Sequence, residues 1–268
     1  MINMRVREVK CKTALSSSSL LGLDYSLNPY RGCQHNCAYC YVPNVLRIPR
    51  NEWGGFVDVK TNIPVVLSKE LKNKKPGVVG ISTVTDPYQP VEKSYRLTRY
   101  CLEQLFKHDF PICIQTKSDL ILRDIDLISR FSKAEVMFSI GTLNEDERKI
   151  LEPYSSPIQN RLDALKQFSN GDIETSVFFG PIYPTVKTSD IPKIVDTFIQ
   201  FGAQEIMIDK FNLKPGIWEN IVKKLSSDKK LKNVFKKNLL ENGSYNQKLF
   251  DEVIHVCNKK DVKAELAF

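Results

Sequence analysis

ICIQTKSDLILRDIDLISRFSKAEVMFSI, at residues 112–140, contains two short apolar runs on either side of an amphipathic segment. The runs Ile112–Thr116 and Val136–Ile140 are rich in Ile, Val and Phe and barely alternate, as is typical of strands covered on both faces. Residues Arg123–Phe131 between them have the apolar spacing of a helix. The stretch therefore predicts one strand–helix–strand unit with parallel strands.

The same alternation recurs on both sides of this unit. Three more apolar runs have the same character, at Val78–Ser82, Thr175–Ile182 and Glu205–Ile208. Helical spacing marks the Leu97, Cys101 and Leu105 stripe and the segments Gln159–Phe168 and Ile191–Phe201. The runs begin roughly 24 to 39 residues apart, which is the pace of βα units in a parallel sheet. With one more strand before Cys33, the sequence predicts an α/β fold with six units, a partial (βα)6 TIM-like barrel rather than a closed eight-unit barrel.

Composition indicates an ordinary globular protein. The chain has 268 residues, of which 42% are hydrophobic and 26% charged, and these values exclude a wholly disordered or membrane-spanning chain. We expect an N-terminal extension at residues 1–21 and a single domain at residues 22–268. The first ten residues contain no apolar segment of a secretion signal, so we expect a cytoplasmic protein without membrane contact. The net charge of +8 permits a polyanionic partner.

Three cysteines lie within eight residues. They read Cys33-Gln-His-Asn-Cys37-Ala-Tyr-Cys40, and three thiolates at this spacing can bind three corners of a cuboidal iron–sulfur cluster. No fourth cysteine lies nearby, so the fourth iron would stay open to an exogenous ligand, as in a catalytic metal centre. The alternative is a zinc knot completed by His35. Zinc sites usually join two separate halves, and the sequence contains no second half.

The cysteine stretch and three other segments resemble a known family. The spacing, with an aromatic residue before the third cysteine, resembles the signature loop of the radical S-adenosylmethionine (SAM) superfamily. The flanking text is similar to the DNA-repair-photolyase-like branch, which is related to spore photoproduct lyase. The resemblance extends from about Gly22 to Phe268, with one departure at Asn36, where the branch usually has glycine. The segments that carry it are Asn28–Tyr41, Ser82–Pro90, Thr116–Ser118 and Leu151–Pro153.

This resemblance implies a cofactor and a chemistry. A 4Fe-4S cluster bound by Cys33, Cys37 and Cys40 would bind SAM at its open iron and cleave it reductively to a 5′-deoxyadenosyl radical. A flavodoxin- or ferredoxin-like protein would supply the electron. The resemblance places Tyr39 against the adenine and Tyr41, the catalytic candidate, just beyond the last thiolate. The alternative for both tyrosines is packing behind the loop.

The ends of the predicted strands supply the candidate SAM contacts, because ligands of parallel barrels gather at the carboxyl ends of the strands. Thr83 and Thr85 are two residues apart, so their side chains point to the same face of the strand, and Asp86 follows where the strand ends. Hydroxyl and carboxylate oxygens are suitable acceptors for an ammonium, and in relatives this strand end binds the methionyl amine of SAM. The alternative for Asp86 is that the Asp-Pro dipeptide opens a turn.

Three further candidates follow the next strands. By resemblance, Lys117 binds the SAM carboxylate, whereas a lysine after a strand is more often a solvated cap. Ser139 offers a hydroxyl to the ribose, and Gly180 lets the backbone approach a ring. Thr83 stands where the lyase carries its hydrogen-donating cysteine. A threonine O–H bond is too strong for that role, which argues against reversal of thymine dimers by the same route.

The C-terminal part of the chain is basic. Residues Lys223–Lys237 contain seven lysines and one acid, in an amphipathic helical pattern whose outer face is either solvated or contacts a nucleic-acid backbone. The leading hypothesis is a radical SAM enzyme with nucleic acid as the substrate class. The alternatives are the same chemistry on a peptide or small metabolite, and a metal-stabilised protein that binds nucleic acid without catalysis. Glu152 and Arg161 match the family branch, but the sequence assigns them no task.

Overall fold

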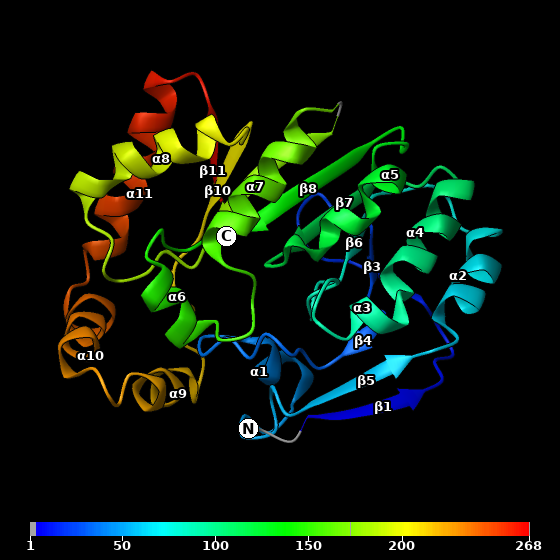
Figure 1. The fold of residues 1–268 in the computed structure, drawn as a ribbon, viewed down its shortest axis with the longest axis horizontal. Coiled ribbons are helices and arrows are strands. Elements are labelled where there is room, and N and C mark those ends of the chain that lie inside the picture. The colour runs from blue at the N-terminus through cyan, green and yellow to red at the C-terminus, as the bar shows by residue number, and fades with distance from the viewer. Residues whose placement is uncertain (1–3, 172, 268) are drawn as a thin grey trace.

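The computed structural model describes residues 4–171 and 173–267, which form a large open sheet with helices outside it and a smaller sheet beside it (Figure 1). Every strand of the large sheet runs parallel to its neighbours except β2, which is antiparallel to β3. Within the described residues the two edge strands, β2 and β11, do not pair, so the barrel stays open. Across the sheet the strands are β11 (Lys263–Leu266), β10 (Glu205–Ile208), β9 (Glu174–Phe179), β8 (Ala134–Ser139), β7 (Ile112–Thr116), β6 (Val79–Ile81), β3 (Tyr25–Leu27) and β2 (Leu15–Ser17).

The partial α/β barrel predicted from the sequence is confirmed. Strands β7 and β10 coincide with their predicted apolar runs, and β6, β8 and β9 overlap theirs. Strand β3 is the one expected before the cysteines. The sheet also has a further parallel strand, β11, which the sequence did not indicate because this edge strand is mostly exposed and carries Lys263 and Glu265.

A small second sheet lies at the lower right of Figure 1. It contains β1 (Arg5–Val9), parallel to β5 (Phe56–Lys60), and β4 (Tyr30–Arg31), antiparallel to β5. Because β4 ends at Arg31, this sheet fixes the chain just before the first cysteine. The predicted extension at residues 1–21 contributes β1 and β2, and its boundary stays a prediction. Residues 1–3 of that extension, and residue 268 of the predicted domain, lie outside the described residues.

Helices cover the outside of the large sheet and continue below it (Figure 1). Helix α7 packs on β8 and β9, and α11 packs on α8 and β11. The helices are α1 (Val42–Leu46), α2 (Ile63–Leu71), α3 (Glu92–Tyr95), α4 (Leu97–Lys107), the 3-10 helix η1 (Asp119–Asp124), α5 (Ile125–Ile128), α6 (Glu145–Leu151), α7 (Ile158–Ser169), the 3-10 helix η2 (Thr188–Asp190), α8 (Ile191–Gln200), α9 (Ile217–Lys224), α10 (Lys229–Lys236), the π-helix η3 (Lys237–Glu241) and α11 (Tyr245–Lys259).

Two predicted helices differ in the structure because polar side chains cap the backbone at other positions. The segment predicted at Arg123–Phe131 begins earlier, as η1, where the Ser118 hydroxyl accepts a hydrogen bond from the Leu120 amide, and α5 ends at Ile128. The basic region is broken after α9, because the Asp228 carboxylate caps a new helix by accepting from the Leu231 amide at 2.8 Å. Such caps favour a helix start at their own position.

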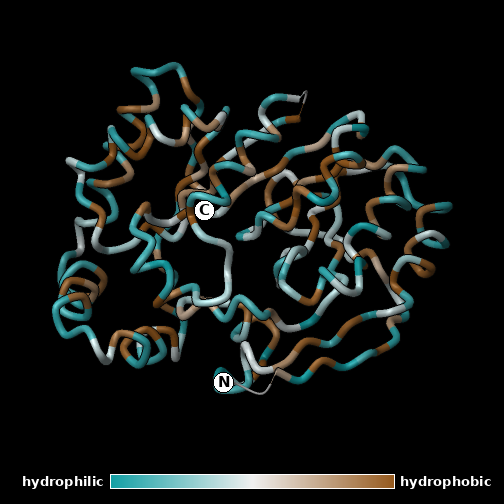
Figure 2. Tube along the Cα trace, viewed as in Figure 1, coloured by the Kyte–Doolittle hydropathy of each residue, from teal (hydrophilic) through white to brown (hydrophobic). Residues whose placement is uncertain are grey.

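The main hydrophobic core lies between the large sheet and its helices, and the apolar residues follow the strands in Figure 2. Side chains of β7 and β8, among them Ile114 and Phe138, are fully buried there. The largest fully buried side chain is nevertheless that of Arg161, a charged group on α7. A buried charge needs a partner, and the partner of Arg161 belongs to the site described next. No helix of the described residues has the length and apolar character needed to cross a bilayer.

Candidate functional site

The cysteine loop connects β4 to α1 and begins at a glycine that no other residue replaces easily. Gly32 has a φ of +91°, and a Cβ there would collide with the carbonyl oxygen of Phe56 on β5. Asn36 inside the loop also has a positive φ, of 50°. Asparagine tolerates this left-handed conformation better than most residues, so the departure from glycine at this position keeps the loop shape.

Hydrogen bonds from distant segments fix the backbone of this loop. The amide of Ala38 donates to the carbonyl of Leu151 at 2.8 Å, and the Asn220 side chain donates to the carbonyl of Ala38 at 2.7 Å. The Arg50 guanidinium donates to the carbonyl of Cys40 at 2.8 Å. The loop is therefore held from α9, from the end of α6 and from the segment before β5, which preorganises the thiols.

All three predicted cluster ligands are free thiols on this loop. Cys33 and Cys37 are buried and Cys40 is half-buried. Burial raises the pKa of Cys33 to about 12 and also raises the pKa values of Cys37 and Cys40. Within the described chain, no three Cys, His, Asp or Glu side chains converge closely enough to bind a single ion. The alternative, a zinc knot, needs His35 as its fourth ligand.

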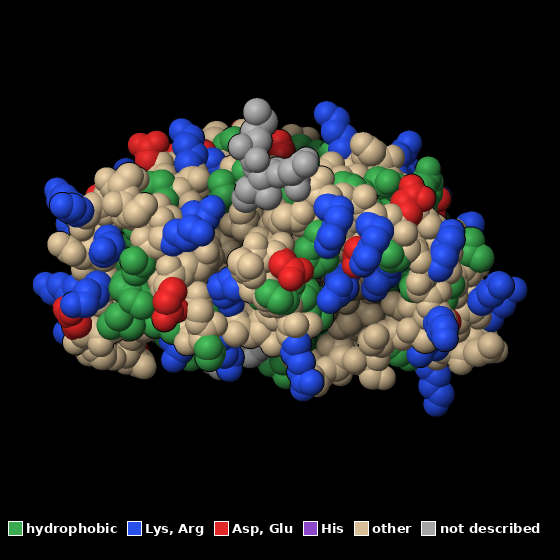
Figure 3. Space-filling view, turned by 90° about the horizontal axis from the view of Figure 1, so that it is seen from below, with side chains coloured by type: hydrophobic (Ala, Val, Ile, Leu, Met, Phe, Trp, Pro, Cys, Tyr) green, Lys and Arg blue, Asp and Glu red, His purple; other side chains and the backbone are tan. Residues whose placement is uncertain are grey.

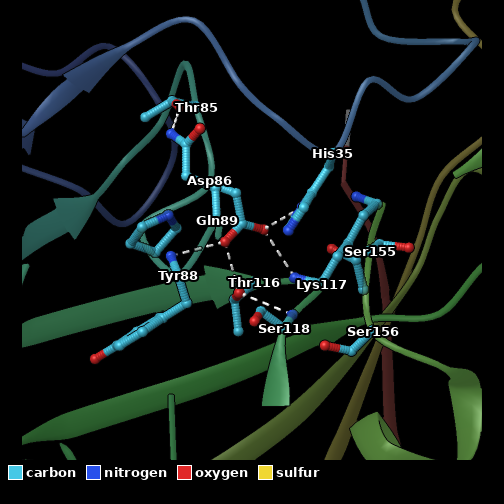
Figure 4. A network of polar contacts seen from close by, with 12 residues as sticks. His35, Thr85, Asp86, Tyr88, Gln89, Thr116, Lys117, Ser118, Ser155 and Ser156 are labelled. Atoms are coloured by element: carbon cyan, nitrogen blue, oxygen red, sulfur yellow. Dashed lines mark hydrogen bonds and ion pairs between the residues drawn. The ribbon is translucent and has the colours of Figure 1, made fainter. Parts of the chain in front are cut away.

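His35 instead contacts Asp86, which joins two strand ends to the loop (Figure 4). The Asp86 carboxylate accepts from the Thr116 hydroxyl at 2.8 Å and from the amides of Lys117 and Tyr88 at 2.9 Å each. His35 Nδ1 lies 3.3 Å from Asp86 Oδ2. Burial acts to raise the pKa of Asp86, but His35 and these hydrogen bonds lower it to about 2. The carboxylate is therefore ionised and already has four polar neighbours.

The two threonines before Asp86 lie in different surroundings. The Thr85 hydroxyl donates to the carbonyl of Gly32 at 2.6 Å and accepts from the Gln89 side chain at 2.9 Å. The Thr83 hydroxyl accepts a long 3.4 Å hydrogen bond from Asn28 and donates none to the described residues. Thr85 thus ties the strand end to the start of the cysteine loop, whereas Thr83 keeps its O–H free.

Lys117 directs a positive charge toward the cysteine loop. Its ammonium lies 5.9 Å from the centroid of the Tyr39 ring and makes no hydrogen bond or ion pair with the described residues. Burial raises the pKa of Cys37 and of Cys40, and the charge of Lys117 opposes that rise at both thiols. Lys117 is half-buried beside two cysteines, unlike a solvated strand cap.

Tyr39 connects the loop to the buried Arg161. Its ring packs edge-on against Phe211 at 5.4 Å and Tyr183 at 6.1 Å, and its hydroxyl donates to the Glu152 carboxylate. Glu152 pairs with Arg161 at 2.5 Å. Burial acts to raise the pKa of Glu152, but Arg161, then Lys117 and Tyr39, lower it to about 2. The predicted adenine contact of Tyr39 stays a prediction.

The other predicted residues lie around this network. The Ser139 carbonyl accepts from Arg161 at 2.8 Å, and the Ser139 hydroxyl accepts from the Gln115 side chain at 3.0 Å. Gly180 directly follows β9, and a Cβ there would collide with the Phe178 ring. Tyr41 is 40% exposed and follows Cys40 directly. The structure therefore brings the thiols, Lys117, Tyr39 and Ser139 into one region. The residues that connect them are ones to which the sequence assigned no task.

Four site residues escaped that reasoning. Glu152 and Arg161 matched the family branch without an assigned task, and His35 was considered only as a zinc ligand. Gln89 lies in the quoted segment Ser82–Pro90, and it is fully buried, with its side-chain oxygen accepting from the amide of Gln34 at 2.9 Å. A polar residue that matches a family motif without an obvious chemical role is the signal that could have marked these positions as supports of the loop.

Comparisons with known proteins show the family and the fold. The family model of the radical SAM superfamily matches residues 27–198. An uncharacterized protein of Methanocaldococcus jannaschii is 30% identical, over 97% of this chain and 95% of its own length. A radical SAM Nalpha-GlyT isomerase of Pseudomonas phage M6 is 26% identical, over 67% of this chain and 38% of its own length. The fold is similar to that of spore photoproduct lyase with bound AdoMet and dinucleoside spore photoproduct, with a TM-score of 0.69 and 14% identity, over 98% of this chain and 81% of that one.

Proposed function

The chain belongs to the radical SAM superfamily, and from this premise we propose that it is an enzyme whose Cys33, Cys37 and Cys40 bind a 4Fe-4S cluster. The observation that carries the proposal is the loop itself, which presents three free thiols, two buried and one half-buried, beside the charge of Lys117. When bound, the cluster supplies the electron and the open iron for reductive cleavage of SAM to a 5′-deoxyadenosyl radical.

Lys117 binds the carboxylate of SAM in this proposal. Its ammonium has no anionic partner among the described residues, and it is half-buried next to the thiols. A point cation in a partly desolvated position forms a strong charge-assisted hydrogen bond to a carboxylate. The Lys117 amide donates a hydrogen bond to the Asp86 carboxylate, and this bond fixes the backbone position from which the Lys117 side chain extends.

The end of β6 receives the methionyl amine. The Thr83 and Thr85 hydroxyl oxygens can accept from an ammonium, and the ionised Asp86 adds a negative field at the same strand end. Because the Asp86 oxygens already accept from the chain itself, we expect the field of this carboxylate to matter more than a direct contact. Ser139 and Gly180, at the ends of β8 and β9, would border the ribose and adenine.

In the sequence, Tyr39 and Tyr41 flank Cys40, the last of the three loop cysteines. Tyr39 is buried against Tyr183 and Phe211, which positions its ring behind the loop, and it would border the adenine there. Tyr41 is partly exposed just after Cys40, where it would face the substrate as the catalytic candidate. Burial of the first tyrosine and exposure of the second support these different roles.

We propose nucleic acid as the substrate class. The supports are the basic helices α9 and α10 and the similarity to spore photoproduct lyase, whose structure contains a dinucleoside spore photoproduct. Sequence-independent affinity for nucleic acid comes from such lysines. A flavodoxin- or ferredoxin-like protein would deliver the electron.

Anaerobic reconstitution with iron and sulfide tests the proposed chemistry. We expect a brown protein that forms 5′-deoxyadenosine from SAM under dithionite. Cys37→Ala should abolish that cleavage, whereas Cys257→Ala, a buried cysteine on α11, should retain it. A colourless protein that binds only zinc, or a Cys37→Ala variant with full turnover, would refute the assignment.

A further inference from the structure

A small apolar cluster separate from the main core lies against the cysteine loop. It contains Cys33 itself, and Cys40 packs on it from the edge. The aromatic members come from the segment between α1 and β5 and from β5. The buried members are Cys33, Val42, Ile48, Trp53 and Phe56.

Trp53 has a buried polar atom that the described chain leaves unsatisfied. The residue is only 6% exposed, and its Nε1 is enclosed without a hydrogen-bond partner. An indole N–H is a donor only, and a buried donor without an acceptor is costly, so native proteins rarely retain one. This donor therefore has the character of a group whose acceptor arrives with a ligand.

Cys40 packs on the edge of the apolar cluster that contains Trp53, so its sulfur is a candidate acceptor for the indole N–H. A thiolate is a stronger acceptor than a thiol. The amide of Trp53 donates to the carbonyl of Arg50 at 3.2 Å, which ties these two residues together. Arg50, three residues before Trp53, donates to the carbonyl of Cys40 and keeps this sulfur in place.

We propose that Trp53 is a positioning residue that donates its indole N–H to the Cys40 sulfur when the iron–sulfur cluster is bound, and thereby raises the reduction potential of the cluster. This inference rests on the function proposed above. Reduction adds negative charge to the cluster and its thiolates, so a fixed donor stabilises the reduced form more than the oxidised form. The enclosure of Trp53 excludes water that could replace the donor.

A redox titration of the reconstituted holoenzyme tests the role of Trp53. Trp53→Phe keeps an aromatic ring but removes the N–H, and we expect its reduced-to-oxidised ratio at a fixed potential to fall about tenfold, or about 59 mV for a one-electron couple. Phe56→Leu is the matched control, because it loosens the same apolar cluster and removes no donor. An intact cluster with unchanged potential in Trp53→Phe, or an equal shift in Phe56→Leu, would overturn the proposal.

A second measurement leaves residue 53 unchanged. The chain contains two tryptophans, so a Trp218→Phe protein labelled with 15N-indole carries its label at Trp53 alone. Pulsed electron paramagnetic resonance of the reduced cluster should detect coupling to this nitrogen, and no coupling would contradict the hydrogen bond. A chain that takes up no cluster would instead refute the proposed function, and this inference with it.

Discussion

At the scale of single residues, the ammonium of Lys117 lies over the Tyr39 ring without an anionic partner in the described chain. We predict that Lys117→Ala retains its iron but binds SAM ten- to a hundred-fold more weakly, because a charge-assisted bond contributes about 1.5–3 kcal/mol. Titration of SAM into the reconstituted variant measures the dissociation constant.

The matched control is Lys166→Ala. The ammonium of Lys166 also lies 5.9 Å from an aromatic centroid, that of Phe201, but on the exposed side of α7. This variant should bind SAM like the unmodified protein. Equal dissociation constants for the two variants would show that Lys117 does not bind SAM.

Glu152 and Arg161 form a buried ion pair, and its stability contribution depends on pH. The usual pKa of the carboxyl is 4.5, and in the folded protein it is lowered to about 2. A lowered pKa stabilises the fold fully above the unfolded value, and this stabilisation is lost as the pH falls toward 2. We predict that Glu152→Gln costs about 3 kcal/mol at pH 7 and less than half of that at pH 3, measured by denaturant unfolding.

Asp126→Asn is the control for Glu152→Gln. The pKa of Asp126 is also lowered to about 2, chiefly by its hydrogen bonds from Arg99, but its side chain is 63% exposed. Solvent screening limits an exposed pair to about 1 kcal/mol or less. If Asp126→Asn lost as much stability as Glu152→Gln, burial of the ion pair would not be the cause of the large effect.

At the scale of elements, the cysteine loop depends on Gly32, the glycine that follows β4. We predict that Gly32→Ala destabilises the fold by about 2–5 kcal/mol, because the new Cβ combines a left-handed backbone with a collision against β5. The iron content of the reconstituted variant should fall with it. Thermal unfolding and iron analysis provide the two measurements.

Gly22→Ala separates the collision from the backbone strain. Gly22 also has a positive φ, of 76°, but nothing lies within 4 Å of the position that a Cβ would take there. We expect Gly22→Ala to lower the free energy of unfolding by about 1–2 kcal/mol and to leave the iron content unchanged. A comparable loss of iron in both variants would mean that the packing against β5 does not shape the loop.

The sequence predicts those elements that bury both faces. Strand β8 is buried along Val136–Ser139 and its apolar run is visible in the sequence, whereas β1 and β11 are exposed strands with charged residues and give no such signal. The cysteine loop was visible because its ligands are close in sequence. The contact between Tyr39 and the Glu152–Arg161 pair joins positions more than a hundred residues apart, and no local pattern reports such a contact.

At the scale of the whole molecule, positive charge is distributed widely. Lys and Arg side chains outnumber Asp and Glu on the face shown in Figure 3, in keeping with the net charge of +8. We predict that replacing exposed Lys229 and Lys230 of α10 by alanine weakens binding of single-stranded DNA. The slope of log affinity against log salt should fall by about 1.4, because each lost phosphate contact removes about 0.7.

The comparison pair is Lys69→Ala with Lys72→Ala, on α2 and just after its end, at the opposite end of the molecule in Figure 1. Both lysines are exposed, so the change in net charge is the same. The same salt slope in the two double variants would assign DNA binding to overall charge rather than to α10.

The hydrogen bonds of the Asp86 carboxylate also couple the opening of two strand exits. It accepts the amide protons of Tyr88 and Lys117, which belong to the exits of two different strands, and it contacts His35 of the cysteine loop. Neither amide can exchange its proton with water until the same buried carboxylate releases it. We therefore expect the two strand exits to open together, so that hydrogen exchange gives both amides the same free energy of opening.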